Sequence, residues 1–250
     1  MGIELQTDKT LLSPDLKLRP AQWADVDAVA QLILDVCTKD GDPTIADTPE
    51  DIEREWKTPG FNLETDAFVV ETSDGRIVGY EVFYENLAHA NMDGDGYVHP
   101  DFMGRGIGTT LLRALEARAR QEMQLADPDL RVFIRNAMAI GDTVGREMHE
   151  NEGYKPIRFH WRMEITLDKA PSAPKLPTGI ELRPFEMRHD RAVYEAHEEA
   201  FSEHWGHVHK SYDEWTHHNA GRDRSHWLIA WDGDQIAAYS LNRIRMGIGW

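Results

Sequence analysis

A turn rich in glycine lies between Met103 and Thr110, directly after a β-rich run that ends at Val98 and directly before a long helical pattern. Glycine adopts backbone conformations closed to other residues and lets the main chain approach a ligand closely. The first N–H groups of a helix lack internal partners, and the helix dipole favours an anion beside them. The pattern therefore predicts a cradle for a diphosphate group, built around Gly104, Gly106 and Gly108.

Two other phosphate-binding motifs do not fit this turn. A P-loop ends in Gly-Lys-Ser/Thr, and there is no lysine between Gly104 and Leu112. The dinucleotide fingerprint GxGxxG needs a third glycine where this chain has Thr109 or Leu111. A glycine-rich helix start that binds no ligand remains the alternative.

The segments around the turn alternate between strand and helix patterns. Apolar residues recur at every second position in the strands and at helical spacing elsewhere. Thr48 before Pro49 marks a helix start, and Ser73-Asp74-Gly75 marks a hairpin. This order predicts an α+β fold, a mixed α/β layer. The expected strands cover 16–20, 66–71, 76–85, the run ending at 98, 130–135 and 154–167, and the expected helices begin near 26, 48 and 106 and cover 142–151.

The opening of this series recurs later in the chain. Leu18-Arg19-Pro20 returns as Leu182-Arg183-Pro184, and the hairpin around Tyr80 returns around Tyr239. The second copy has helical patterns over 191–205 and 212–219 but no counterpart of the glycine turn, which favours a chain truncated in mid-pattern. A proline-rich stretch separates the copies. The predicted division is a first domain over 1–168, a linker over 169–178 and the N-terminal half of a second domain over 179–250.

Composition narrows the classes of function. A formal net charge of −17 would repel phosphate, so we expect neither nucleic acid nor a membrane surface as a partner, whereas a cationic amine is easily accommodated. No stretch approaches the ~18 apolar residues that a membrane span requires. Cys37 is the only cysteine, which excludes an intrachain disulfide and a zinc module and fits a reducing cytoplasm.

The motif V-x-P-x-x-x-G-R-G-I-G-T-x-L-L, from Val98 to Leu112, resembles the coenzyme A loop of the GNAT acetyltransferases. The Leu-Arg-Pro opening resembles their first strand, and residues 148–154 resemble the end of their last helix. Two such domains in one chain are similar to tandem GNAT proteins of the mycothiol synthase type. The resemblance implies a central, mostly antiparallel sheet flanked by helices, followed by a partial second copy, with acetyl-CoA as co-substrate.

The resemblance also assigns residues that would hold acetyl-CoA. The backbones of Tyr97 and Val98 would pair with the pantetheine arm, and main-chain N–H groups of the loop would bind the pyrophosphate. Arg105 and Arg113 would add positive charge. Met103 stands where the family usually has Arg or Gln. The full set is Tyr97, Val98, Met103, Gly104, Arg105, Gly106, Ile107, Gly108 and Thr109.

The implied reaction is N-acetyl transfer, in which the amine of a small-molecule acceptor attacks the thioester directly. A backbone N–H near Val98 would stabilise the oxyanion. A carboxylate would take the amine proton. We expect Asp93 in this role, with Asp95, Glu81 and Glu85 as alternatives, although each could equally be a solvated charge.

The family's last helix often carries a Tyr that protonates the departing thiolate. The corresponding positions here hold Asp142, Gly145 and, in place of that Tyr, His149. His149 could supply the proton, since histidine titrates near neutral pH. An exposed helical histidine without a catalytic role is the alternative.

These departures keep a second hypothesis open: a non-catalytic acetyl-CoA-binding domain that supports a second acyltransferase domain. The open hairpin edge of the second copy could also pair with another chain and give a homodimer. Histidines crowd between His204 and His218, but their spacing matches no closed zinc pattern. We therefore expect no metal.

Overall fold

The computed structural model describes residues 12–250, so the first eleven residues of the expected domain 1–168 lie outside the described part. The chain divides into two compact units between Gly153 and Tyr154. In the first unit the strands are β1 (Leu16–Pro20), β2 (Ala67–Thr72), β3 (Ile77–Leu87), β4 (Asn91–Val98) and β5 (Phe133–Asn136). Its helices are α1 (Val26–Lys39), α2 (Pro49–Trp56), α3 (Leu63–Asp66), α4 (Ile107–Glu122) and α5 (Thr143–Asn151).

The strands of the first unit form one sheet in the order β1-β2-β3-β4-β5. β1 to β4 run antiparallel to their neighbours, whereas β5 lies parallel to β4. A parallel neighbour needs a crossover connection, and the long helix α4 provides it. The predicted α+β fold with a mostly antiparallel sheet is confirmed.

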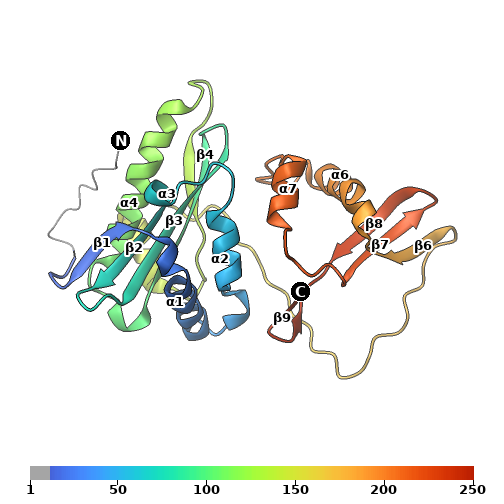
Figure 1. Cartoon of the computed structure of the whole chain (residues 1–250), viewed down its shortest axis with the longest axis horizontal. Coiled ribbons are helices and arrows are strands. Elements are labelled where there is room, and N and C mark those ends of the chain that lie inside the picture. Colours follow the sequence, from blue (N-terminus) through green and yellow to red (C-terminus); the bar gives the residue numbers. More distant parts are fainter. Residues whose placement is uncertain (1–11) are drawn as a thin grey trace. The chain divides into compact units, whose positions relative to one another are not determined.

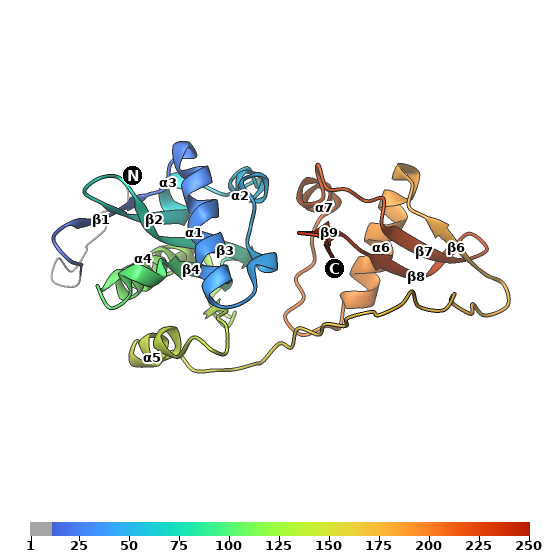
Figure 2. The ribbon, with the colours of Figure 1, turned by 90° about the horizontal axis from the view of Figure 1, so that it is seen from below.

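Helices cover both faces of this sheet, as Figures 1 and 2 show. α1 and α2 pack on one face over side chains such as Val69 and Val82. α4 packs on the other face over Phe68 and Val78. Because β2 is buried from both sides, its sequence AFVV reads as a continuous apolar run and not as an alternation.

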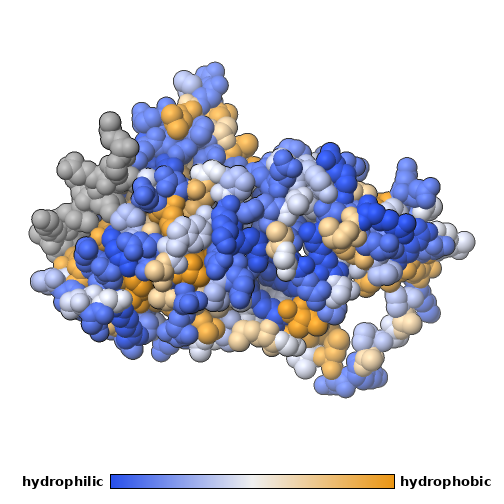
Figure 3. Space-filling view, in the orientation of Figure 1, coloured by the Kyte–Doolittle hydropathy of each residue, from blue (hydrophilic) through white to orange (hydrophobic). Residues whose placement is uncertain are grey.

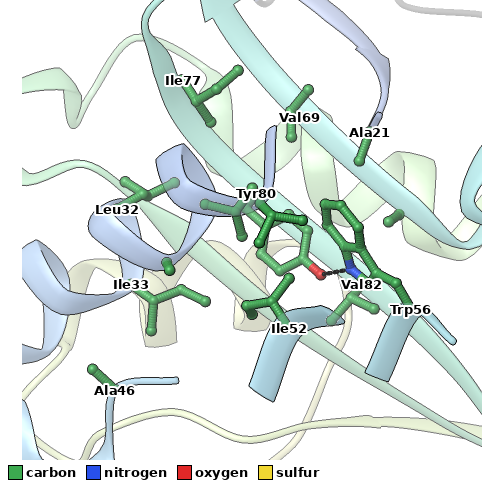
Figure 4. Packing of buried hydrophobic residues seen from close by; sticks show 14 of the residues in the cluster. Ala21, Leu32, Ile33, Ala46, Ile52, Trp56, Val69, Ile77, Tyr80 and Val82 are labelled. Carbon is green, nitrogen blue, oxygen red and sulfur yellow. Dashed lines mark hydrogen bonds between the residues drawn. The ribbon is translucent and has the colours of Figure 1, made fainter. Parts of the chain in front are cut away.

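Trp56 and Tyr80 meet in the core between α2 and β3 (Figure 4). The indole N–H of Trp56 donates to the Tyr80 hydroxyl at 3.0 Å, and both side chains are buried. A buried polar atom costs free energy unless it is hydrogen-bonded, so this bond allows two large aromatic side chains to share the core. It also fixes the end of α2, and with it Glu55, against the sheet.

The second unit repeats the first half of this topology. β6, β7 and β8 pair antiparallel in sequence order, as β1, β2 and β3 do. A β-bulge follows Val70 in β2 and, at the matching place, Ala230 in β7. The partial second copy is thus visible in the strand pairing. Its elements are β6 (Ile180–Pro184), α6 (Asp190–Phe201), α7 (Tyr212–His218), β7 (Trp227–Asp232), β8 (Gln235–Leu241), β9 (Ile244–Arg245) and β10 (Ile248–Gly249).

The strands predicted over residues 154–167 are absent, because this segment forms neither helix nor strand. Its apolar residues do alternate, but their side chains are 56% to 92% exposed. A strand needs a neighbour for its N–H and C=O groups, and an alternating pattern does not supply one. The prediction was wrong because it rested on the pattern alone. The exposed side chains are Ile157, Phe159, Trp161, Met163, Ile165 and Leu167.

Two elements are shorter than predicted. β5 begins at Phe133 and not at Leu130, because Asp127 forms a turn whose oxygens accept from the backbone N–H groups of Asp129 and Leu130. α6 ends at Phe201 and not at Trp205. The boundary between the compact units also precedes the linker predicted over 169–178, so the assignment of 154–168 to the first domain stays a prediction.

Hydrophilic side chains cover much of the face seen in Figure 3. Acidic residues outnumber basic ones by 44 to 27, and like charges at the surface oppose association. Within residues 12–250, no helix has the length and apolar character needed to cross a membrane.

Candidate functional site

The chain turns sharply between the end of β4 and the start of α4. The N–H of His99 donates to the Val78 carbonyl at 2.9 Å, which ends the pairing of β4 with β3. A 3-10 turn over Pro100–Phe102 follows, and then φ is 73° at Gly104 and 80° at Gly106. Side chains are strained at such left-handed angles, so this turn requires glycine.

α4 begins at Ile107 without a side chain that caps its first turn. Thr48 caps α2, and Asp142 caps α5. The N-cap residue of α4 is Gly106, which has no side chain to offer, so the N–H groups of the first turn remain available to a ligand anion. This geometry suits the diphosphate group predicted for the turn.

The arginines beside the turn are paired with acids. Arg105 Nη2 lies 2.7 Å from Asp15 Oδ2, and this hydrogen bond lowers the pKa of the Asp15 carboxyl. Arg113 Nη2 lies 2.9 Å from Glu152 Oε1. Their charges are therefore largely offset, and an anion at this turn would depend mainly on main-chain donors. Met103, at the start of the loop, has a side chain that is 48% exposed.

β4 has an open edge next to the turn. β5 pairs with β4 only from Asn91 to Gly94, so among the described residues the backbone of Asp95–Val98 has a strand neighbour on one side only. An extended ligand can pair with such an edge through main-chain hydrogen bonds. Tyr97 and Val98, the residues assigned to the pantetheine arm, lie on this edge.

Asp93 faces Arg135 across the parallel pair of β4 and β5. The guanidinium donates from Nε to Oδ1 at 2.6 Å and from Nη2 to Oδ2 at 2.9 Å. The bidentate pair engages both carboxylate oxygens of Asp93 and links β5 to β4. The role of Asp93 as the base stays a prediction.

His149 lies in α5 and contacts β5. Its Nδ1 donates to the Gly145 carbonyl at 2.8 Å, and its Nε2 accepts from the Asn136 side-chain nitrogen at 3.2 Å. Both ring nitrogens are thus engaged in hydrogen bonds within the first unit. The transfer of a proton from His149 to a departing thiolate stays a prediction.

Two carboxyl groups associated with β4 and α2 have raised pKa values. Burial raises the pKa of Glu55 to about 8, and the charges of Asp47 and Asp95 add to this effect. Burial also raises the pKa of Asp95 to about 6, against the hydrogen bond that the Tyr97 hydroxyl donates to it at 2.9 Å. Perturbed carboxyl groups beside an open strand edge are typical of functional sites.

Glu55 was absent from the predicted site residues. It follows Ile52 by three positions in α2 and therefore shares the helix face that packs on the sheet. The Tyr84 hydroxyl of β3 donates to it. An acid at helical spacing from buried apolar residues is the sequence signal that could have identified Glu55.

Glu55→Gln is expected to stabilise the protein at alkaline pH. The folded-state pKa of about 8 lies above that of an unfolded glutamate, so the wild type loses stability as pH rises towards 8, because only the unfolded state ionises freely in that range. The melting temperature of the variant should exceed that of the wild type at pH 9 and match it at pH 4. Glu53→Gln, on the exposed side of α2, is the control and should change little at either pH; a pH-independent effect of Glu55→Gln would contradict the prediction.

The histidine-rich stretch forms local contacts. His207 Nε2 and His209 Nδ1 both lie against Oε2 of Glu198, at 3.2 and 2.6 Å. In the part of the chain that the structure describes, no three His, Cys, Asp or Glu side chains are arranged to hold a metal ion.

Comparison with known proteins identifies the class to which this fold and loop belong. A family model described as the acetyltransferase (GNAT) family matches residues 31–141. The solved structure of a GCN5-related N-acetyltransferase from Sphaerobacter thermophilus superposes with a TM-score of 0.75 at 32% identity, over 96% of this chain and 75% of that chain. The chain belongs to the GCN5-related N-acetyltransferase, or GNAT, family.

Curated relatives carry the name mycothiol acetyltransferase. The protein of Thermobispora bispora is 34% identical over 113 residues, which are 44% of this chain and 34% of the relative. That of Geodermatophilus obscurus is 27% identical over 175 residues, 66% of this chain and 52% of the relative. The chain thus spans between about a third and a half of these relatives. The predicted resemblance to GNAT proteins of the mycothiol synthase type is confirmed.

Proposed function

We propose that the first unit transfers an acetyl group from acetyl-CoA to the amine of a small-molecule acceptor by direct attack. The observation that carries this proposal is the placement of an uncapped helix N-terminus at Gly106 beside the open edge of β4 at Asp95–Val98. Coenzyme A joins a diphosphate to an extended amide chain, and these two features would hold the two parts. Membership of the GNAT family supports the same function.

Each part of the site has a role in this proposal. The first-turn N–H groups, from Ile107 to Thr109, would hold the pyrophosphate, and the left-handed turns at Gly104 and Gly106 direct the main chain around it. The backbones of Tyr97 and Val98 would pair with the pantetheine arm. Acetyl-CoA supplies the activated acyl group when bound.

The acidic residues near the open edge of β4 favour an acceptor that carries a positive charge. Glu55 and Asp95 are half-buried carboxyl groups with raised pKa values, and Asp47 contributes further negative charge to both. An ammonium group would relieve the mutual repulsion of these acids. The net charge of −17 would also attract a cationic acceptor over longer distances.

Two contacts favour a second function, the binding of acetyl-CoA without turnover in support of another acyltransferase domain. Arg135 engages both oxygens of Asp93, and His149 has both ring nitrogens engaged, so the expected base and acid are tied into the fold. The curated relatives extend beyond the length of this chain.

Calorimetric titration with acetyl-CoA, followed by a thiol-release assay, separates the two functions. The proposed transferase should bind acetyl-CoA and release free thiol with primary amines but not with alcohols of the same carbon skeleton. Binding without release for any amine would favour the non-catalytic function. Absence of binding would contradict both.

A further inference from the structure

The second unit contains a cavity of about 470 Å³ where β8 ends and the chain continues into the hairpin of β9 and β10. The entry of β7 forms one wall with His226 and Leu228, and the hairpin forms the other with Arg243, Ile244 and Trp250. Sites for small molecules commonly have volumes of roughly 300–1,000 Å³. The cavity is therefore large enough for a ligand, and no residue assigned to acetyl-CoA or to its acceptor lines it.

Hydrogen bonds connect the two walls. The N–H of Arg243 donates to the main-chain oxygen of Trp250 at 2.9 Å, and the N–H of Trp250 donates to the Arg243 carbonyl at 2.8 Å. The side-chain nitrogen of Asn242 donates to the His226 carbonyl at 3.1 Å, which ties the base of the hairpin to the entry of β7. The hairpin lies at the label β9 in Figure 1. The cavity is thus formed by segments that are bonded to each other.

The hairpin has no counterpart in the first unit. There β3 continues for eleven residues and pairs with β4 as far as Leu87. In the second unit β8 ends at Leu241, opposite Trp227 of β7, and within residues 12–250 it has a strand neighbour on one side only. The chain then turns at Asn242 into the hairpin. The cavity is therefore a feature of the second unit and not a copy of the proposed acetyl-CoA site.

Arg243 supplies positive charge to the cavity. Its guanidinium lies 5.8 Å from the centre of the Trp250 ring and forms no ion pair or hydrogen bond with another described residue. Four other arginines of the same unit pair with acids: Arg183 with Glu181, Arg188 with Glu186, Arg191 with Glu195 and Arg224 with Asp190. No Asp or Glu of the described part of the chain lines the cavity. In a chain with a formal net charge of −17, this local excess of positive charge favours an anionic ligand.

Two further donor groups belong to the cavity lining, His226 and Trp250. Asp223 interacts electrostatically with His226 but does not line the cavity, and it accepts from the backbone N–H of Ser225 at 2.9 Å. The indole nitrogen of Trp250 is buried and has no acceptor within residues 12–250. A buried N–H without an acceptor costs free energy, so the indole gains by turning towards an acceptor in the cavity.

Apolar side chains complete the lining. Leu228 is 39% exposed and Ile244 is 60% exposed. The apolar core of the second unit lies on the other face of β7, around Ile229, so Leu228 takes no part in it. An apolar ligand group would remove this surface from water. The cavity thus combines a cation, donors without acceptors and exposed apolar surface.

We propose that this cavity binds a small monocarboxylate with an apolar body. A guanidinium presents paired N–H donors that match the two oxygens of one carboxylate. Arg243 holds the carboxylate, and Leu228 and Ile244 contact the body. The net charge of the chain opposes the binding of anions in general, so this binding depends on the local arrangement. The proposal stands independently of acetyl transfer by the first unit.

Titration of the full chain with benzoate tests the proposal, with NMR recording the indole N–H signals of the eight tryptophans. The signal that is absent from a Trp250→Phe variant belongs to Trp250. We expect benzoate to shift this signal to saturation. Benzamide has the same body without the charge, and acetate has the charge without the body, so each should bind at least tenfold more weakly. Benzylamine, which carries the opposite charge, should leave the signal unchanged.

Arg243→Gln should lower the affinity for benzoate at least tenfold, because a hydrogen bond to a charged group is lost. Arg183→Gln is the matched control. Arg183 also lies over a tryptophan ring, 5.7 Å from the centre of Trp231, and its loss changes the net charge equally. It pairs with Glu181 and does not line the cavity, so its affinity should stay within twofold of the wild type.

Three results would overturn the proposal. One is a Trp250 signal that benzoate does not shift. Another is equal affinity for benzoate and benzamide, which would remove the role of the carboxylate. The third is an equal loss of affinity in Arg243→Gln and Arg183→Gln, which would show that the charge of the whole chain, and not the cavity, governs binding.

Discussion

Acetyl-CoA is expected to bind a Gly106→Trp variant at least 100-fold more weakly than the wild type. The indole would occupy the space in front of the α4 N-terminus, and the φ of 80° at Gly106 strains any side chain, so the first-turn N–H groups would lose their alignment. A 100-fold loss corresponds to about 2.7 kcal/mol of binding free energy. Isothermal titration calorimetry measures the difference directly.

Gly60→Trp is the matched control for this variant. Gly60 has a φ of 88°, and a Cβ added there would meet nothing within 4 Å. It lies between α2 and α3, so the substitution introduces a similar backbone strain and the same side chain away from the α4 N-terminus. Equal affinity of the Gly106→Trp variant and the control would show that acetyl-CoA binds elsewhere.

Arg118→Ala is expected to destabilise the first unit by about 3–5 kcal/mol. Arg118 Nε lies 2.6 Å from Asp66 Oδ1, Nη1 donates to Glu122, and the guanidinium lies 4.5 Å from the centre of the Phe83 ring. Although burial opposes it, the hydrogen bonds from Arg118 and His89 hold the pKa of Glu122 below its ordinary value. Removing the arginine leaves two buried carboxylates without their main partner.

Urea unfolding, read by hydrogen exchange in peptides of the five-stranded sheet, measures this loss for the first unit alone. Arg120→Ala is the matched control, two positions along the same helix. Arg120 pairs with Glu116 at 2.7 Å, but its side chain is 67% exposed, so we expect a loss below about 0.5 kcal/mol. A comparable loss for the two variants would contradict the importance given to burial.

The glycine turn could be recognised in the sequence because its requirements are local. Left-handed dihedrals at Gly104 and Gly106, and a helix start at Ile107, depend on a few consecutive residues. The strand and helix order of the first unit was predictable for the same reason, apart from element ends. The repeat was also recognisable from short motifs. Leu182-Arg183-Pro184 lies in β6, which pairs with β7 as the strand of Leu18-Arg19-Pro20 pairs with β2.

The roles of the acidic residues could not be predicted in the same way. Asp93, Asp95 and Glu81 are acids in neighbouring strands, and the sequence pattern favoured Asp93 as the base without any information on the partners or the burial of the three carboxyl groups. Arg135, which engages Asp93, is 42 residues away in the chain. Glu81 is distinguished by burial and by the absence of a cationic partner among the described residues, and these properties arise from the sheet and from α4.

The failed prediction over residues 154–167 has the same origin. Alternation of apolar residues is a property of the segment, whereas strand formation depends on a neighbour with free N–H and C=O groups. The start of a helix does not depend on a neighbouring strand. Short patterns therefore predicted correctly that α2 starts at Thr48 and α5 at Asp142, which are their N-cap residues.

The sequence by itself therefore determined the GNAT family, the order of the elements, the repeat and the glycine turn, because each can be recognised from short stretches of consecutive residues. Only the tertiary structure decided that, within residues 12–250, β4 has an open edge from Asp95 to Val98, that Asp93 is bound by Arg135 and that Glu81 is buried with its Oε1 lacking a hydrogen-bond partner among those residues. Pairing, burial and the pKa of a carboxyl depend on groups from distant segments, and folding alone brings those groups together.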